Sequence, residues 1–328
     1  MKRSDYKKKK RKGLKYSLLF VALLAIVIGA YWAYQYNNGK SLAEVDTAQE
    51  GNTEFDDFEG ADSEFGEVNI LLIGNDARDD EEARSDALMI GHYDQTTKAI
   101  KVVSLMRDTY VEIPGHGQQK LNAAYFFGGP ELVRKTIKKN FDVDIQYYAI
   151  VDFTGFSKIV DIIAPDGIQV SIPYPMSHGI GMTLEPGDQA LNGEQLLGYV
   201  RFRHDIHSDF GRVERQQEAL SKLKDEAISI QTLFNIPKLL GLVNPYIDTN
   251  VDNRLLLSIG KDMLIGGKSQ SMETLRIPIE NSFVDKTVTG VGAVLDIDIE
   301  QNKEALQQFL TSKDETIKSD LDVNEVSK

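Results

Sequence analysis

Hydrophobic positions divide the chain into short strands and amphipathic helices. Six apolar runs are short, rich in Val, Ile and Leu, and bounded by polar or turn residues, a pattern that predicts strands. They are residues 68–74, 87–93, 99–106, 145–153, 168–173 and 273–279. Helical spacing of apolar residues predicts helices near 130–141, 154–163, 192–200, 209–229, 233–244, 253–265 and 301–310. Strands interspersed with helices indicate an α/β fold with a mixed sheet.

The N-terminus has a different pattern, in which a basic arm precedes an uncharged run. Residues 1–15 hold nine Lys or Arg and one Asp, whereas residues 16–36 carry no charged side chain. A run of 21 residues is long enough to cross a bilayer as a helix. Its end is rich in aromatic residues, as in an interfacial belt, namely Tyr31, Trp32, Tyr34 and Tyr36. We therefore predict one transmembrane helix, with a cytoplasmic N-terminus and everything after it outside the cell.

Two other interpretations of this segment stay open. A cleaved signal peptide usually ends in small residues, whereas this run ends in bulky aromatic ones. A lysine-rich arm also occurs in nucleic-acid-binding proteins, but directly before a membrane span a topology signal and contact with anionic lipids explain it better. We predict no nucleic-acid partner, because the folded part faces outward and is acidic.

Composition separates the rest of the chain into three parts. Residues 37–67 form a predicted extended linker, with ten Asp or Glu and no Lys or Arg from residue 41 onward. Residues 68–312 form a single predicted globular domain, and residues 313–328 a polar tail. The chain has 328 residues, a formal net charge of −13 and no cysteine, which excludes disulfides, thiolate metal sites and cysteine nucleophiles.

Carboxylates and arginines are predicted to meet at one end of the sheet. The connections between the first three strands are short, which favours an antiparallel meander. Asp76 then follows the first strand, and Arg84 and Asp86 precede the second. Arg107 and Asp108 follow the third strand. Two or three carboxylates and two arginines should therefore meet at this end of the sheet.

A second group of arginines lies in a short segment of this acidic chain. Arg201 and Arg203 are two residues apart, so they project the same way from an extended backbone. Arg212, Arg215 and Gln216 have the spacing i, i+3, i+4 and share one face near the start of a predicted helix. The positive end of a helix itself favours anions. This segment therefore suits a multiply charged anion.

Two interpretations of these charges remain. The first is a surface ion-pair network. The second is a site for a phosphate-rich ligand, because the planar guanidinium matches phosphate oxygens bidentately. Asp76 and Asp86 are candidate ligands for Mg²⁺, with Mn²⁺ as the alternative, since such ions complete their shell with phosphate oxygens and water. His204 and His207 are three apart but have no evident third ligand, so zinc is not predicted.

Seven segments together resemble one known family. In chain order they are NILLIGNDAR, RSDALMI, SLMRDTYVEIPG, KLNAAYFFGGPELVRKT, YYAIVDFTGF, LNGEQLLGYVRFRHD and DFGRVERQQ. With compatible spacing, they resemble the LytR-CpsA-Psr family over about residues 68–224, and most of all its MsrR-type members. The predicted cytoplasmic arm, single span and outer domain also match the usual layout of that family.

The resemblance implies a three-layer α/β/α domain that binds polyprenyl-pyrophosphate lipids. It also implies transfer of an anionic glycopolymer, such as wall teichoic acid or capsule, from that lipid to peptidoglycan in a Gram-positive type of cell wall. By resemblance, Asp76 and Asp86 bind the metal, and Asp76, Arg84 and Arg107 are catalytic, with Asp76 as the hypothetical base. The implied pyrophosphate-binding residues are Arg84, Arg107, Arg201, Arg203, Arg212 and Gln216, with Arg215 and Gln217 close to the last two in register.

Two alternative functions share the same residues. If water replaces the acceptor hydroxyl, the site would act as a pyrophosphatase on lipid-linked precursors. Without chemistry, the chain would be a membrane-anchored regulator or lipid sensor of cell-wall homeostasis.

Overall fold

The computed structural model of the chain covers most of the predicted globular domain. The described residues are 30–31, 33–38, 40, 57–62, 66–75, 85–205, 208–228, 236–266 and 272–312. Most of the predicted membrane span and acidic linker lie outside them, as do the C-terminal tail, Asp76 and Arg84. Within the part that is described, no helix is both long and apolar enough to cross a membrane.

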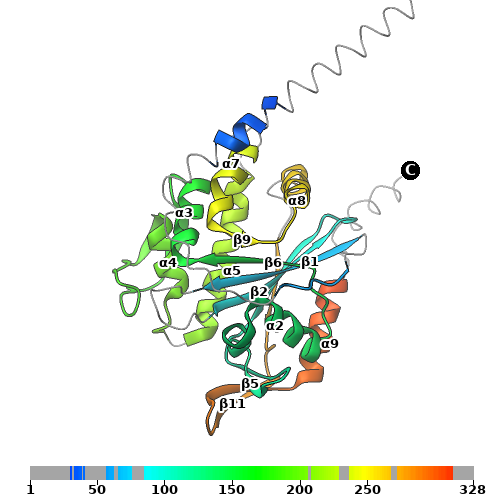
Figure 1. Ribbon diagram of the computed structural model, residues 1–328. Helices are drawn as coiled ribbons and strands as arrows, with labels where there is room; N and C mark the ends of the chain where they lie inside the picture. The colour runs from blue at the N-terminus through cyan, green and yellow to red at the C-terminus, as the bar shows by residue number, and fades with distance from the viewer. Residues whose placement is uncertain are drawn as a thin grey trace, which may run out of the picture.

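A mixed sheet of six strands forms the centre of the domain (Figure 1). In spatial order the strands are β10 (Glu273–Ile277), β3 (Ile100–Leu105), β2 (Ser85–Asp94), β1 (Glu67–Asn75), β6 (Tyr147–Asp152) and β9 (Asp248–Thr249). The predicted meander is confirmed, because β2 pairs antiparallel with both β1 and β3. β6 and β10 add parallel to β1 and β3. The carboxyl ends of β1, β3, β6 and β10 therefore share one edge, at which β2 begins.

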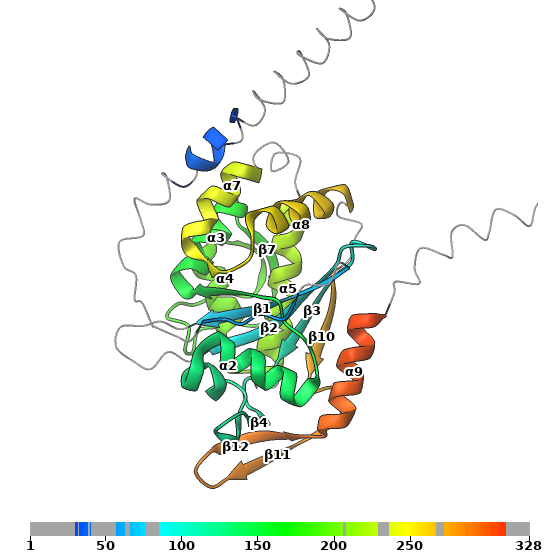
Figure 2. The ribbon, with the colours of Figure 1, turned by 45° about the vertical axis from the view of Figure 1, so that its right-hand side comes forward.

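Helices cover both faces of this sheet and give the domain three layers (Figures 1 and 2). One face carries α2 (Ala123–Phe141) and α9 (Ile299–Thr311). The other carries α3 (Phe153–Ile163), α4 (Gly193–Arg201), α5 (Ser208–Ala227), α7 (Ile236–Val243) and α8 (Asn253–Gly266). A short 3₁₀ turn, η1 (Asn244–Tyr246), follows α7. The predicted α/β fold with a mixed sheet is confirmed.

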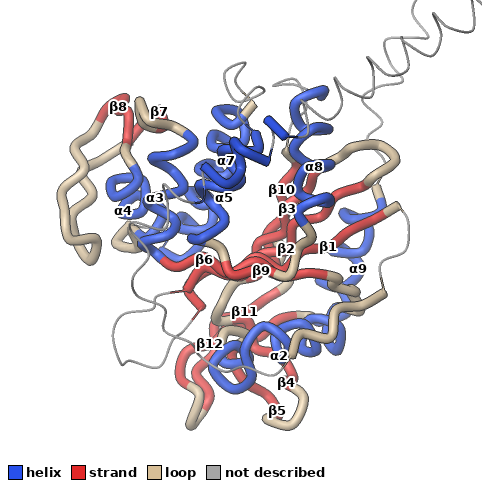
Figure 3. The backbone as a smooth tube through the Cα atoms, turned by 45° about the horizontal axis from the view of Figure 1, so that its top comes forward, coloured by secondary structure: helices blue, strands red, loops and turns tan. Residues whose placement is uncertain are grey.

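Two smaller sheets flank the central one, as Figure 3 shows. The first contains β11 (Phe283–Val288), β12 (Gly292–Ile297), β4 (Thr109–Ile113) and β5 (Gly117–Lys120), and the second pairs β7 (Ile168–Ile172) with β8 (Gly187–Leu191). Sequence patterns predicted only β7 among these strands. β5 (GQQK) and β8 (GDQAL) were missed because they are polar and lack an apolar run. β4, β11 and β12 were missed because charged residues interrupt their apolar positions.

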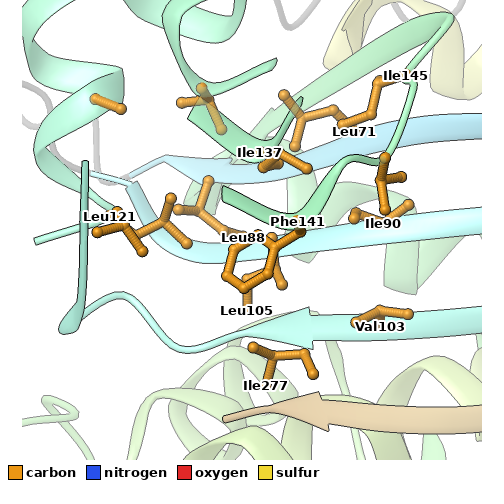
Figure 4. Packing of buried hydrophobic residues seen from close by; sticks show 14 of the residues in the cluster. Leu71, Leu88, Ile90, Val103, Leu105, Leu121, Ile137, Phe141, Ile145 and Ile277 are labelled. Atoms are coloured by element: carbon orange, nitrogen blue, oxygen red, sulfur yellow. The ribbon is translucent and has the colours of Figure 1, made fainter. Parts of the chain in front are cut away.

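Two large apolar cores and a small third cluster, of Met106, Val213 and Leu295, stabilise the domain. The larger core lies between the central sheet and the helices α2 and α9 (Figure 4). In it, Leu71, Ile90, Val103, Ile137 and Phe141 are all 0% exposed. Each such side chain stabilises the fold by about 1.5–3 kcal/mol relative to an exposed one. The smaller core joins α3, α4 and α5 to the β7–β8 hairpin, and it contains Phe202, in the connection from α4 to α5.

A buried histidine lies within the central sheet. His92 is 2% exposed, and its Nδ1 lies 2.8 Å from Asn69 Oδ1. The Asn69 amide nitrogen donates to the Asp144 carbonyl, which fixes the amide orientation and makes His92 Nδ1 the donor. Burial, with a further contribution from Lys101, lowers the pKa of His92 from 6.5 to about 4. The folded chain therefore holds this imidazole neutral.

His92 is expected to make the fold sensitive to acid. Between pH 6.5 and about 4 the unfolded chain binds a proton that the folded chain does not, so stability falls as the pH falls through this window. The shift corresponds to a loss of about 3 kcal/mol in the free energy of unfolding. Denaturant titrations across this pH range should show about 3 kcal/mol more loss of stability in the wild type than in His92→Gln. An equal loss in both proteins would contradict this assignment.

Candidate functional site at the edge of the sheet

The meander brings a predicted carboxylate and a predicted arginine together at the shared edge. Asp86 is the second residue of β2, and Arg107 follows the end of β3, where Leu88 pairs with Leu105. Arg107 Nη1 donates to Asp86 Oδ1 at 2.9 Å. Their side chains are 24% and 22% exposed, so both are accessible from solvent. The predicted meeting of these two side chains is confirmed.

Arg203 reaches the same carboxylate from the helical layer. Its Nη2 donates to Asp86 Oδ1 at 2.9 Å. Helix α4, which precedes it, begins with a capping box between Asn192 and Gln195. A side chain at Gly193 would meet the Ser157 carbonyl at 2.0 Å, so glycine is required for α4 to pack this closely against α3. This packing positions the end of α4, and with it Arg203, above the sheet edge.

Helix α5 adds the predicted arginine Arg212, which is buried. It also adds the carboxylate of Asp209, which was not predicted at the site. Arg212 is 2% exposed, and its Nη2 lies 3.3 Å from Asp209 Oδ2. The same oxygen lies 3.3 Å from Arg107 Nε, and Asp209 Oδ1 lies 3.7 Å from Arg203 Nε. Asp209 thus lies among three arginines. Its i, i+3 spacing to Arg212 was the available signal.

Asp108 is also at the predicted edge, but it faces a further cation. Its Oδ1 accepts from Lys120 Nζ at 2.8 Å, and its Oδ2 lies 3.4 Å from Arg107 Nε. Lys120 ends β5, a strand that the sequence analysis missed. Pairing of β5 with β4 brings Lys120 next to Asp108, and this pairing was not predicted.

The three arginines change the charge states in the site in different ways. Burial raises the pKa of Asp86, but Arg203, Arg107 and Arg212 outweigh it and hold this pKa below its usual value. Burial lowers the pKa of Arg107, but Asp209, Asp108 and Asp86 outweigh it and raise this pKa. For Arg212 burial dominates, and its pKa falls to about 10. Asp86, Arg107 and Arg212 are thus all charged at neutral pH.

Some guanidinium donors in the site have no acceptor. Arg212 Nε and Nη1 are buried and make no hydrogen bond with any residue that the structure describes. Leaving a buried donor unpaired costs about 1–3 kcal/mol. An anionic ligand with several oxygens would remove this cost and would match the forked geometry of arginine. The unpaired donors therefore favour an anion site over an ion-pair network that is complete in itself.

The other predicted residues make different contacts or are not described. The Arg201 guanidinium stacks over the Phe153 ring, 4.1 Å from its centroid. Arg215, predicted to bind pyrophosphate, instead donates to Asp205 Oδ2 at 2.7 Å and to the Phe202 carbonyl. Gln216 is partly buried on α5. Asp76 and Arg84 fall outside the described residues, so their predicted places at this edge stay predictions.

Similarity to known sequences identifies the family. The model of the LytR_cpsA_psr family matches residues 31–308. The chain belongs to this family. A family relative, "Regulatory protein MsrR" of Staphylococcus aureus strain COL, is 39% identical over 280 residues, covering 85% of this chain and 84% of the relative. Another, "Polyisoprenyl-teichoic acid--peptidoglycan teichoic acid transferase TagU" of Enterococcus faecalis, is 31% identical over 239 residues, covering 71% and 76%.

Solved structures of LytR_cpsA_psr-like proteins share the fold. Bacillus subtilis TagV superposes with a TM-score of 0.64 at 26% identity, covering 76% of this chain and 100% of TagV. The structure titled "TagT bound to LI-WTA" superposes with a TM-score of 0.58 at 26% identity, covering 75% of this chain and 89% of that one. The mixed central sheet and its helical layers are thus a property of the family.

Proposed function

We propose that the chain is a phosphotransferase that attaches an anionic glycopolymer from a polyprenyl-pyrophosphate carrier to peptidoglycan. Membership of the LytR_cpsA_psr family supports this proposal, together with relatives whose names describe teichoic acid transferases. The observation that carries it is the group of Arg107, Arg203 and Arg212 around Asp86 and Asp209, with donors left unpaired. Wall teichoic acid and capsule-type polymers are the donors we favour.

In the proposed reaction, an acceptor hydroxyl on peptidoglycan attacks the phosphorus atom that bears the glycan. A new P–O bond forms, the bridging P–O bond of the pyrophosphate breaks, and its electrons leave with polyprenyl phosphate. The hydroxyl proton passes to a base, for which Asp76 is our candidate. Arg107, Arg203 and Arg212 bind the pyrophosphate oxygens and stabilise the charge that develops on them. Arg84 and Arg201 are proposed to bind further oxygens of the same pyrophosphate.

The residues present suit a divalent cation that is shared with the substrate. No group of three or more His, Asp or Glu suited to a metal occurs among the described residues. Mg²⁺ needs only one or two protein carboxylates when phosphate and water complete its shell. The ionised, partly exposed Asp86 meets this need, and Asp76 would be the second ligand. The bound Mg²⁺, or Mn²⁺, would neutralise pyrophosphate charge.

The location of this reaction is part of the proposal. The uncharged run at residues 16–36 would anchor the chain in the cell membrane, and the basic arm would stay in the cytoplasm. The catalytic domain would then face the wall, where peptidoglycan is available. A single anchored domain also keeps the site near a lipid-linked donor.

A transfer assay with arginine variants tests the proposal. The full-length chain in detergent is mixed with a short-chain polyprenyl-pyrophosphate glycan and peptidoglycan oligomers, with Mg²⁺ or EDTA. Mass spectrometry should detect a phosphodiester-linked product that needs Mg²⁺ and falls at least about 100-fold in Arg203→Ala. Arg254→Ala, an exposed arginine at the start of α8, is the matched control and should keep full activity.

Other outcomes would replace the proposal with one of its alternatives. Free glycan phosphate without a linked product would indicate a pyrophosphatase. Donor binding without turnover, across several donors, would favour a regulator or lipid sensor. That second candidate has specific support, because the 39% identical relative bears the name of a regulatory protein.

A further inference from the structure

Arg215, on α5, binds the segment that carries Arg203. Arg215 Nη1 donates to Asp205 Oδ2 at 2.7 Å, and its Nη2 donates to the Phe202 carbonyl. The side chains of Arg215 and Asp205 are only 9% and 2% exposed. The contacted groups flank Arg203 in sequence, one directly before it and one two residues after it. Arg215 thus binds the backbone carbonyl before Arg203 and the Asp205 side chain after it.

The surroundings of Arg215 fix its guanidinium in this position. It lies over the rings of Phe202 and Tyr199, at 5.5 and 6.0 Å from their centroids. Tyr174 donates a second hydrogen bond to Asp205 Oδ2 at 2.8 Å. Burial raises the pKa of Asp205, but Arg215 and Tyr174 outweigh it and hold that pKa below its usual value. The contacts therefore form a charged, buried clamp.

The segment that the clamp holds carries the more exposed of the two arginines on Asp86. The Arg203 side chain is 31% exposed, and its residue lies in a non-helical connection between α4 and α5. Ordering a long side chain and its backbone on a ligand costs binding free energy. A clamp that holds this segment before the ligand arrives removes part of that cost.

We propose that Arg215 is a positioning residue, which clamps Phe202 and Asp205 so that Arg203 is preorganised for the pyrophosphate of the donor. This inference rests on the proposed function, because it assigns pyrophosphate to the site. It differs from the sequence prediction, in which Arg215 touches the ligand itself. A lysine at position 215 keeps the charge but lacks the fork that reaches both partners.

A double-mutant cycle on inorganic pyrophosphate binding tests the coupling. Calorimetry on the full-length chain with Mg²⁺ should show weakening by about 10- to 100-fold in Arg203→Ala and by about tenfold in Arg215→Lys. Because Arg215 acts through Arg203, Arg215→Lys should add less than about a twofold loss in the Arg203→Ala background. Fully additive losses in the double variant would overturn the proposal.

Tyr199→Phe is the matched control for a general loosening of the same helices. The Tyr199 hydroxyl donates to Glu218 Oε2 at 2.7 Å and so joins α4 to α5 one turn beyond Arg215. Its removal should lower the melting temperature but leave pyrophosphate affinity within about twofold of the wild type. An equal loss of affinity in Tyr199→Phe would mean that helix packing, not the clamp, sets the affinity, and would overturn the proposal.

A second measurement does not depend on the proposed function. Hydrogen exchange at the amides of Phe202 and Ser208, which donate to the carbonyls of Gly198 and Asp205, should be faster in Arg215→Lys than in Tyr199→Phe, because only the first variant releases this segment. Equal exchange rates would overturn the clamp. If the wild-type chain binds no pyrophosphate but shows the exchange difference, the clamp on Arg203 stands. Pyrophosphate as its ligand, and with it the proposed function, would then be contradicted.

Discussion

Asp86→Asn is expected to reduce glycopolymer transfer by about 100- to 1,000-fold while the chain stays folded. The Asp86 carboxylate accepts from both Arg107 and Arg203 through one oxygen, at 2.9 Å in each case. A neutral amide cannot balance two guanidinium groups, so the two arginines should separate. The variant would also lose the proposed carboxylate ligand of Mg²⁺. Initial rates in the transfer assay, at saturating Mg²⁺, measure this effect.

Asp285→Asn is the matched control for Asp86→Asn. Asp285 is an exposed carboxylate on β11, in the smaller four-stranded sheet. Its variant should transfer glycopolymer at the wild-type rate, and thermal melts of both variants should show that each is folded. Near-normal transfer by a folded Asp86→Asn protein would contradict a role for this carboxylate.

Arg212→Met is expected to abolish transfer and yet to make the fold more stable. Burial dominates at Arg212 and lowers its pKa from 12.5 to about 10, which corresponds to a cost of about 3 kcal/mol for the charged form. This cost is present in full below pH 10, because Arg212 is then charged in both the folded and the unfolded chain. Its partner Asp209 keeps Arg107 and Arg203, so no buried carboxylate is left unpaired.

Denaturant unfolding at pH 7 measures the predicted gain in stability. Replacing such a buried charge by an apolar side chain of similar length should raise the free energy of unfolding by about 1–3 kcal/mol. Loss of transfer with a gain in stability is typical of a residue that is kept for function. A variant that is both inactive and less stable would show instead that Arg212 holds the fold together.

The fold was predictable where side-chain pattern decides the element. The runs that form β1, β2 and β3 are continuous and apolar, and their short connections favour the antiparallel meander that the structure shows. The sheet of β11, β12, β4 and β5 was not predictable in the same way. β12 pairs with β4 across most of the domain sequence, and β5 reads GQQK, so neither periodicity nor proximity in sequence indicates the pairing.

The sequence predicted which edge of the sheet carries the site, but it did not predict which partner each side chain contacts there. Strand direction alone places Asp86 and Arg107 together, and the structure confirms this pair. Helical spacing placed Arg212 and Arg215 on one face, but spacing does not say which partner each side chain meets. Arg212 lies beside Asp209, whereas Arg215 turns to Asp205. That difference depends on how α5 packs against the connection from α4, which is tertiary information.

The most direct test of the central claim is a crystal structure of the chain with a short-chain polyprenyl pyrophosphate and Mg²⁺. We expect pyrophosphate oxygens at about 2.7–3.2 Å from guanidinium nitrogens of Arg107, Arg203 and Arg212, with Arg215 still bound to Asp205. Pyrophosphate bound elsewhere, with these three arginines still engaged only by Asp86 and Asp209, would contradict the assignment of this edge as the donor site.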